Sequence, residues 1–363
     1  MKEGYAMTSV ERVKNLFNHK KTDRIGFYEH FWSDTCQKWV ADGKLNEKDD
    51  IFDVFPYDIN AAGWVNPIAD LDFQEEIINE DNDTITRKDG NGTIKRHHKK
   101  NVSTPEHVGY TITERAQWED LAKQKIKFDS RRVDYVNYRN MREDCAKKNR
   151  FFMCHSSSIF EAMHDMCGHE NILVGMALDP EWICDMSNVY IDMFISQYED
   201  LFSKEGKPDG FFISEDLGFK QRPFMSPAMY KELIMPGHKM LIDFAHSLGL
   251  PLMMHSCGFI EPLIPHMIEA GLDGLQAMEV KAGMDLLRIH KNYGEKLALM
   301  GGLDIRALET NNKTKIDEEL EAKIPVVKEG FAYFLHTDHS VPKSVDFDTY
   351  SYFVEKGLSL GTY

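Results

Sequence analysis

The sequence predicts a (β/α)8 barrel, and three observations lead to this prediction. From residue 151 onwards, short apolar runs alternate with longer helical segments, a pattern typical of right-handed βαβ units around a parallel sheet. Two earlier apolar runs, near residues 25–29 and 58–64, bring the number of expected strands to eight. No GxGxxG motif follows the first strand, which weighs against an open dinucleotide-binding sheet.

The individual elements follow from the spacing of the apolar residues. The eight expected strands are residues 25–29, 58–64, 150–155, 210–214, 251–255, 274–277, 297–301 and 331–335. The later helices are expected at residues 158–168, 179–203, 227–248, 260–270, 283–291, 315–329 and 346–358. A length of 363 residues suits one barrel domain over the whole chain, residues 1–363, with additions to the minimal fold.

The additions are expected within residues 1–150, which also contain the first two strands. Residues 8–19 form an amphipathic N-terminal helix, with Ser9 as its N-cap. Residues 81–113 alternate like an antiparallel hairpin around a Gly- and Asn-rich turn, and are expected to form a β excursion on the surface. Residues 115–150 carry many charges and are expected to form a solvated helix.

Composition and charge exclude several classes of function. The formal net charge is −16 and there is no basic stripe, so binding to nucleic acid or to an anionic membrane surface is not expected. The 6 cysteines are scattered and form no disulfide framework or CxxC pair. With no signal peptide and no long apolar span, the chain is expected to be a cytoplasmic protein with free thiols.

The expected strands end in side chains that can carry chemistry. In a barrel of this type the active site lies at the C-terminal ends of the strands. The side chains found there are His155, Glu215, Asp216, His255, Cys257, Gln276, Glu279, Asp304, His336, Asp338 and His339. A ring of titratable and metal-binding groups at this position predicts an enzyme that acts on a small molecule.

A metal site is predicted at the end of the strand 251–255. His255 and Cys257 are two residues apart, so both side chains point the same way from an extended segment. Imidazole and thiolate together favour zinc. The third ligand should come from another strand end, and His339 is the preferred candidate, with Asp338 as an alternative ligand or as a group that orients an imidazole. The structural alternative is a packed strand end with an inert thiol.

Other candidate residues have both a functional and a structural interpretation. Glu215 and Asp216 can act as a general base or bind a substrate ammonium group, or one of them can cap a helix. Arg222 can meet an anionic substrate group or pair with Glu215. Glu161 can face the barrel mouth or form a capping box with Ser158. Position alone suggests a catalytic role for Glu279 and substrate-binding roles for His155 and Asp304.

At these residues the sequence resembles the uroporphyrinogen decarboxylase superfamily, over nearly the whole chain. The matching segments are Thr8–Lys14 with Arg24-Ile25, Gly168–Asn171, Glu215–Gly218, His255–Gly258, Gly271–Asp273 and Gly301–Asp304. The resemblance implies a (β/α)8 barrel, in agreement with the strand count. It also implies one of two activities, because the superfamily has two broad branches.

The true decarboxylases need neither metal nor cofactor and hold their tetrapyrrole with an arginine-rich N-terminal segment. The corresponding stretch here, residues 27–32, has no arginine. The second branch contains zinc methyltransferases of corrinoid systems, whose ligands follow the pattern His-x-Cys and a later Cys. His255 and Cys257 match the first two, whereas no cysteine follows Cys257 and His339 stands in the place of the third.

The resemblance therefore favours a zinc-dependent methyltransferase that moves a methyl group between a corrinoid protein and a thiol or methoxylated small molecule. Glu215, Asp216 and Glu279 would orient the substrate or move protons. The first alternative is a cofactor-free decarboxylase of the uroporphyrinogen type. A second alternative is a barrel that binds a corrinoid or tetrapyrrole without turnover.

Overall fold

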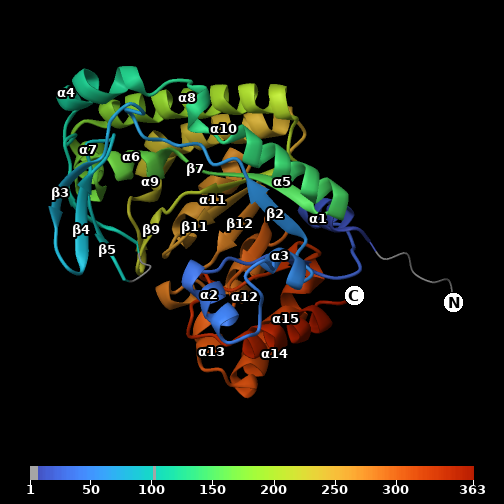
Figure 1. Ribbon diagram of the computed structural model, residues 1–363. Helices are drawn as coiled ribbons and strands as arrows, with labels where there is room; N and C mark the ends of the chain where they lie inside the picture. The colour runs from blue at the N-terminus through green and yellow to red at the C-terminus, as the bar shows by residue number, and fades with distance from the viewer. Residues whose placement is uncertain (1–6, 101–103) are drawn as a thin grey trace.

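The computed structural model describes residues 7–100 and 104–363, and its centre is a nearly closed barrel of eight parallel strands (Figure 1). The strands are β1 (Gly26–Phe27), β2 (Ile59–Ala62), β7 (Phe151–Ser157), β8 (Gly210–Ser214), β11 (Leu252–Ser256), β12 (Gly274–Ala277), β13 (Ala298–Gly301) and β14 (Tyr333–Leu335). Consecutive strands pair in parallel from β2 to β14, and β14 pairs with β1. Between β1 and β2, Asp58 N donates to Phe27 O at 2.9 Å. The predicted (β/α)8 barrel and its eight strands are confirmed.

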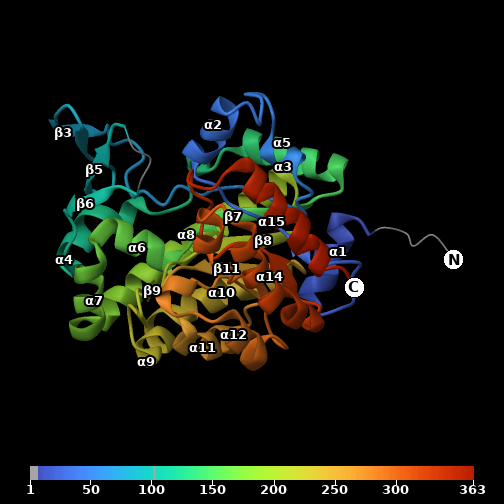
Figure 2. The ribbon, with the colours of Figure 1, turned by 90° about the horizontal axis from the view of Figure 1, so that it is seen from below.

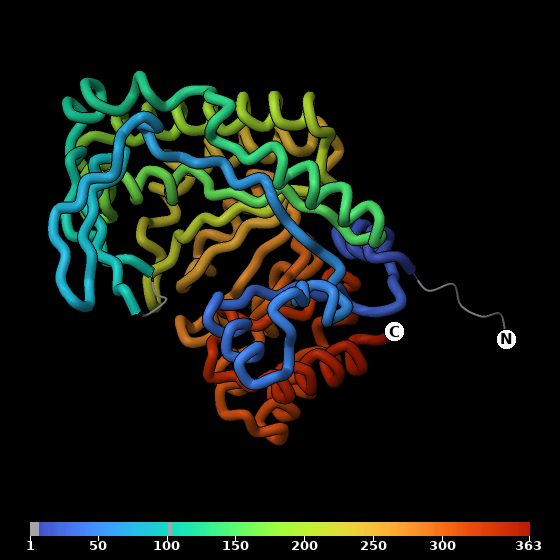
Figure 3. The backbone as a smooth tube through the Cα atoms, in the orientation of Figure 1, coloured from blue at the N-terminus to red at the C-terminus, as the bar shows by residue number. Residues whose placement is uncertain are grey.

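The helices lie outside the strands (Figures 1 and 2). They include α5 (Tyr135–Lys148), α6 (Ile159–Cys167), α8 (Pro180–Glu205), α10 (Met235–Ser247), α11 (Ile264–Ala270), α12 (Leu286–Tyr293), α14 (Lys313–Val327) and α15 (Phe347–Leu360). The N-terminal and C-terminal parts of the chain, blue and red in Figure 3, lie side by side. Ile25 N donates to Gly361 O at 3.0 Å, so the two ends of the chain are joined beside β1.

The helix α1 (Ser9–Phe17) closes the N-terminal end of the barrel. Val13 and Leu16 are buried in one cluster with Phe151, Met253 and Phe334 from inside the barrel. Its N-cap is Thr8 rather than the predicted Ser9, because Thr8 and Glu11 form a reciprocal capping box. Apolar side chains therefore fill the N-terminal end of the barrel. The polar residues that follow the strands lie at the opposite, C-terminal end.

The β excursion forms a four-stranded antiparallel sheet beside the barrel (Figure 1). Its strands are β3 (Glu76–Glu80), β4 (Thr84–Lys88), β5 (Ile94–His98) and β6 (Glu106–Gly109). The predicted segment 81–113 accounts for three of them, apart from residues 101–103, which lie outside the described residues. The prediction missed β3. Thr93 and Lys95 attach the sheet to Asp165 at the end of α6, at 2.8 and 2.7 Å.

Two expected helices differ from the structure, and one helix was not expected. The segment 115–150 contains only short irregular turns before α5. A further helix, α7 (His169–Leu178), lies between the two expected at 158–168 and 179–203. The helix expected at 227–248 is divided into α9 (Pro227–Met229), the π-helical turn η4 (Tyr230–Ile234) and α10. Pro236 has no backbone N–H to donate to the preceding turn, which accounts for this division. Within the described residues, no helix is long and apolar enough to cross a membrane.

Candidate metal centre and active site

Three potential metal ligands meet at the C-terminal ends of β8 and β11. His255 lies in β11, Cys257 follows that strand, and Asp216 lies two residues beyond β8. The Nε2 atom of His255 is 3.3 Å from Cys257 Sγ and 3.2 Å from Asp216 Oδ1. Among the described residues, these three form the one group of ligand atoms lying within 4.8 Å of one another. The predicted pair therefore has a carboxylate as its neighbour.

Two glycines allow the loops after β8 and β11 to touch. A Cβ atom on Gly218 would lie 2.5 Å from the carbonyl oxygen of Cys257, so a larger residue has no room there. Gly258 has a φ of +77°, a left-handed conformation that glycine adopts without strain. Because the loops touch, Asp216 Oδ1 also accepts the Cys257 N–H at 2.8 Å. This contact holds the carboxylate beside His255.

Gln276 fixes the orientation of the His255 ring. Its Oε1 contacts His255 Nδ1 in a short hydrogen bond, and a carbonyl oxygen can only accept. His255 Nδ1 therefore carries a proton, and Nε2 points toward Cys257 and Asp216. On its other side, Gln276 Nε2 lies 3.3 Å from Nε2 of His336.

The pKa shifts of His255 and Asp216 both favour a positive charge next to a negative one. Burial alone would lower the pKa of His255, but Cys257 and Asp216 raise it well above its ordinary value. Burial likewise opposes ionisation of Asp216, yet His255 and the Cys257 N–H hold its pKa at about 2. Burial raises the pKa of the Cys257 thiol. The group thus stabilises a positive charge between its three members, here a proton on His255.

Glu215 is turned away from this group and anchors the helices behind it. Its carboxylate accepts the N–H groups of Phe160 and Glu161, at 2.9 and 3.1 Å, at the start of α6. The same carboxylate contacts Nε2 of His238 at 2.5 Å, and His238 Nδ1 lies 3.0 Å from the Tyr230 hydroxyl. The structure therefore places Glu215 as a helix cap, although at α6 and not at the helix after residue 226.

Glu161 lies beside the ligand group and does not cap its own helix through Ser158. Its Oε1 accepts the N–H of Asp216 at 3.0 Å, and its Oε2 is 3.0 Å from His164 Nε2. Burial raises the pKa of Glu161. Burial acts in the opposite direction on His164, but Glu161 raises the pKa of this imidazole. The two side chains form a buried acid–base pair in contact with the loop that carries Asp216.

Two of the predicted carboxylates, Glu279 and Asp338, fasten the loops around the mouth. Glu279 Oε2 accepts the N–H of Gly258 at 2.7 Å, immediately after Cys257. Asp338 accepts the N–H groups of Val280 and Ile305, both at 2.8 Å, and so connects the ends of β12, β13 and β14. Both carboxylates are buried and accept backbone N–H groups, and the second oxygen of Glu279 pairs with Lys281 at 3.1 Å, which suits positioning better than direct chemistry.

The remaining predicted residues lie outside the three-ligand group. Asp304 caps α13 (Ile305–Glu309) and pairs with Arg306 at 2.7 Å. The His339 ring stacks on Trp32 with centroids 6.2 Å apart. Arg222 lines a separate cavity beside the hairpin of β9 (Gly218–Phe219) and β10 (Arg222–Pro223). The structure thus groups Asp216, and not His339, with His255 and Cys257.

A set of neutral histidines lines the mouth next to the ligand group. His30 lies 5.4 Å from His336 and 6.3 Å from His155, between ring centroids. Burial lowers the pKa of His155 to about 4 and that of His336 to about 3, and it lowers the pKa of His30 well below its ordinary value. These rings are uncharged at neutral pH. His155 Nε2 lies 3.1 Å from Ser214 Oγ, and Trp64 packs edge-on against the His155 ring.

Glu29, two residues after β1, contacts one of these histidines. It is fully buried, and its Oε2 accepts the N–H and hydroxyl of Thr337, at 2.9 and 3.0 Å. Its Oε1 lies 3.2 Å from His336 Nε2. Burial raises the pKa of Glu29 to about 8, so the group is protonated at neutral pH. Sequence reasoning gave no role to Glu29, His30, Gln276 or His336, although all four stand at strand ends.

The comparisons with known proteins agree with this architecture. The sequence model of the family described as uroporphyrinogen decarboxylase (URO-D) matches residues 104–357, more than half of the 363-residue chain. Among curated protein sequences, none matches this chain. A solved structure of a methyltransferase from Methanosarcina mazei superimposes with a TM-score of 0.64 at 12% identity, covering 96% of this chain and 98% of that one.

A Xaa-Pro dipeptidase structure with bound methionine gives a TM-score of only 0.30 at 15% identity, over 70% of this chain and 68% of that one, and carries no argument. The likeness to the methyltransferase structure, at 12% identity, confirms the fold and does not by itself establish an activity. The family match confirms the resemblance seen in the sequence. The chain belongs to the uroporphyrinogen decarboxylase family.

Proposed function

We propose that this protein is a zinc-dependent methyltransferase that works with a corrinoid protein. The observation that carries the proposal is the group of Asp216, His255 and Cys257 at the barrel mouth. Ligand atoms on a tetrahedral zinc ion lie roughly 3.3–3.7 Å apart. The separations of 3.2 and 3.3 Å around His255 Nε2 are close to this range. We infer that Asp216 is the third ligand, in place of the predicted His339.

The donor set fits zinc in chemistry as well as in spacing. A thiolate, an imidazole and a carboxylate are all established zinc ligands, and three protein ligands are typical of a catalytic site with an open position. The hydrogen bond from His255 Nδ1 to Gln276 is the type of outer contact that orients a ligating imidazole. Bound zinc would supply Lewis acidity, activating a thiol acceptor or the oxygen of a methoxylated donor.

The surrounding residues would bind the small molecule and take up its proton. His30 and His155 offer uncharged nitrogen atoms, and the half-exposed Trp64, which packs on the His155 ring, offers an apolar surface. The Glu161–His164 pair, which touches the Asp216 loop, would hold a proton released by the acceptor at Glu161 Oε2 or His164 Nε2. The mouth of the barrel is where the corrinoid protein would approach.

A second candidate is decarboxylation of a uroporphyrinogen, and the description of the matching family favours it. The residues at the mouth support it less well. A substrate with many carboxylates would meet the carboxyl groups of Asp216 and Glu161 and the neutral ring of His155, and the segment 27–32 contains no arginine to bind it. Incubation with uroporphyrinogen and chromatography of the products separates the two candidates, since only the decarboxylase converts it.

Metal analysis tests the main proposal directly. The wild-type protein, loaded with zinc and dialysed, should retain about one zinc ion per chain, and Cys257→Ala and Asp216→Asn should retain far less. Wild-type protein should then transfer methyl groups from methylcobalamin to a small thiol, and both variants should lose this activity. Glu279→Gln is the matched control, because it keeps a side-chain oxygen to accept the Gly258 N–H. Equal zinc in wild type and Cys257→Ala would exclude the proposal.

A further inference from the structure

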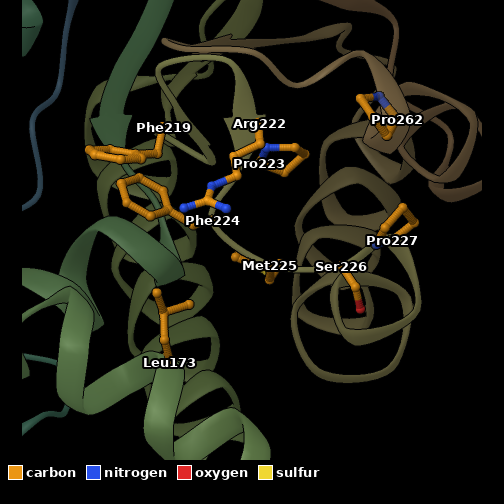
Figure 4. Close-up of a pocket in the computed structure, with 9 residues that line it drawn as sticks. All are labelled: Leu173, Phe219, Arg222, Pro223, Phe224, Met225, Ser226, Pro227 and Pro262. Carbon is orange, nitrogen blue, oxygen red and sulfur yellow. The ribbon is translucent and has the colours of Figure 1, made fainter.

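A cavity lies beside the hairpin that follows β8, whose Gly218 touches the loop of Cys257. The hairpin consists of β9 (Gly218–Phe219) and β10 (Arg222–Pro223), which pair in antiparallel fashion. The cavity has a volume of about 520 Å³ and lies between this hairpin, Leu173 of α7 and Pro262 (Figure 4). None of its lining residues is a member of the three-ligand group. It is therefore a separate cavity, and its size is in the range of pockets for small molecules.

The walls of the cavity are apolar and partly exposed. Phe219 and Phe224 stand one above the other in Figure 4, with ring centroids 5.6 Å apart. Phe219 is 43% exposed, which is unusual for so large an apolar side chain next to a concave surface. Leu173 and Met225 complete the apolar lining. A ligand with an aromatic or branched hydrocarbon body would cover this surface.

The charges beside this apolar surface are positive: Arg222 lines the cavity, and Lys220 Nζ lies 5.4 Å from the centroid of the Phe219 ring. The guanidinium of Arg222 extends from the hairpin toward Phe224 and the cavity (Figure 4). Within residues 7–100 and 104–363, Arg222 takes part in none of the ion pairs or side-chain hydrogen bonds that the structure records. Arg288, on the same side of the barrel, instead binds Glu261 through two nitrogens at 3.0 and 2.6 Å. Arg222 is exposed, and its guanidinium over an apolar floor is suited to bind the anionic group of a ligand.

We propose that this cavity binds a small aromatic carboxylate. The planar guanidinium of Arg222 would pair with the carboxylate, and the aromatic body would lie against Phe219 and Phe224. Glu215, which the sequence suggested as a partner of Arg222, does not compete with the ligand. Its carboxylate is buried against His238. This site goes beyond the proposed methyl transfer and does not depend on the metal.

The cavity also communicates with the metal ligands through a stack of rings. Phe224 lies parallel to His169, with centroids 4.2 Å apart, and His169 lies parallel to His164 at 4.1 Å. His164 pairs with Glu161, which accepts the N–H of Asp216. These contacts connect the wall of the cavity to the loop that carries Asp216.

Calorimetric titration tests the proposal with benzoate, phenylacetate and 3-phenylpropionate, each paired with its neutral amide. We expect at least one acid to bind the wild-type protein in the micromolar to low millimolar range, at least about tenfold more tightly than its amide. Arg222→Gln should weaken binding of that acid by at least about tenfold. Phe219→Ser should weaken it by several-fold. Arg96→Gln, which changes an exposed arginine of the β excursion, should have no effect.

The outcomes separate this site from the metal centre. Cys257→Ser should bind the acid as tightly as wild type, so failure of the zinc proposal leaves this test unaffected. Absence of binding for all three acids up to about 10 mM overturns the proposal, as does equal affinity in Arg222→Gln. An aryl phosphate that binds more tightly than every carboxylate, and still requires Arg222, overturns the choice of carboxylate. Loss of binding in Cys257→Ser overturns the separation of the two sites.

Discussion

The two ends of the barrel hold their buried carboxylates in different ways. At the N-terminal end, Asp58 is completely buried and pairs with Arg12 at 2.6 Å and with Arg24 at 2.7 Å. The Phe27 N–H donates to the same carboxylate at 2.9 Å. Guanidinium groups remain charged at any pH at which proteins fold. This end of the barrel is therefore held by a permanent ionic connection between α1, β1 and β2.

At the C-terminal end, buried carboxylates meet histidines and backbone N–H groups. Within the described residues, the basic side chains in contact with the carboxyl groups of Glu29, Glu215 and Asp216 are all imidazoles. Imidazoles change their charge near neutral pH, and they can exchange a proton for a metal ion. We call the N-terminal end of the barrel, held by arginines, the structural end, and the C-terminal end, with its histidines, the chemical end. The difference between them gives specific ways to test the assignment.

The largest effect on stability is expected at the structural end. Asp58→Ala leaves Arg12 and Arg24 without their buried partner, and should lower the free energy of unfolding by about 3–5 kcal/mol. Urea unfolding followed by circular dichroism measures this loss, and zinc per folded chain should stay unchanged. Asp304→Ala removes a carboxylate paired with the exposed Arg306 and should cost only about 1 kcal/mol. Equal losses in the two variants would contradict the comparison.

The pH dependence of stability should come from the chemical end. Burial raises the pKa of Glu29 to about 8, so the native protein holds a proton there that the unfolded chain releases near the ordinary value of 4.5. Between these values the native state binds more protons, and stability falls as the pH rises from about 4.5 to about 8. Glu29→Gln keeps the neutral form. It should be more stable than wild type at pH 9, by on the order of 3 kcal/mol, and little different at pH 4.5.

The buried histidines titrate in the opposite direction and provide a control for that measurement. Burial lowers the pKa of His155 to about 4 and that of His336 to about 3. Wild type and Glu29→Gln should therefore both lose stability as the pH falls below 6.5, the ordinary pKa of an imidazole. Because wild type and Glu29→Gln share this loss, the variants are compared at the same pH by urea unfolding. A stability difference that does not change between pH 4.5 and 9 would show that Glu29 is ionised throughout.

A smaller effect is expected where an uncharged residue orients the metal ligand. Gln276→Leu removes the acceptor of His255 Nδ1, and should lower zinc affinity by about 10–100-fold while Asp216, His255 and Cys257 remain. Competition with a chromophoric chelator measures this affinity. Gln276→Glu retains an acceptor and should restore most of the loss. Wild-type affinity in Gln276→Leu would mean that the ring is held by its other contacts.

The sequence predicted the barrel well because its signals are local. Eight apolar runs, each followed by a helix or a loop, are enough to place the strands, and their ends identify the chemical end. The predictions that differ depend on contacts that no local pattern records. The turn η4 follows from Pro236, whereas α7 and β3 carry no distinct periodicity: β3 is exposed along its whole length.

The sequence identified the types of residue in the candidate site, but not which of them contact one another. His255 and Cys257 were identifiable because two ligands lie on one strand end, two residues apart. Asp216 was recognised as a strand-end residue, but not as a ligand, because its approach depends on the contact between Gly218 and Gly258. Gln276 and Glu29 escaped assignment since an amide and a buried acid acquire a role only from their neighbours, His255 and His336.

The smallest expected effect concerns His339, the ligand that sequence reasoning favoured. It follows β14, which two strands separate from β11 in the sheet, whereas Asp216 follows the neighbouring β8. Its ring stacks on Trp32, and its Nδ1 lies 3.4 Å from the Ser340 carbonyl oxygen. His339→Ala should therefore change zinc affinity by no more than about twofold, against a loss of more than about 100-fold in Cys257→Ala, in the same chelator competition. A comparable loss in both variants would mean that the loop after β14 closes on the metal. The C-terminal end of the barrel would then rearrange when zinc binds, while the N-terminal end, held by Arg12 and Arg24, stays fixed.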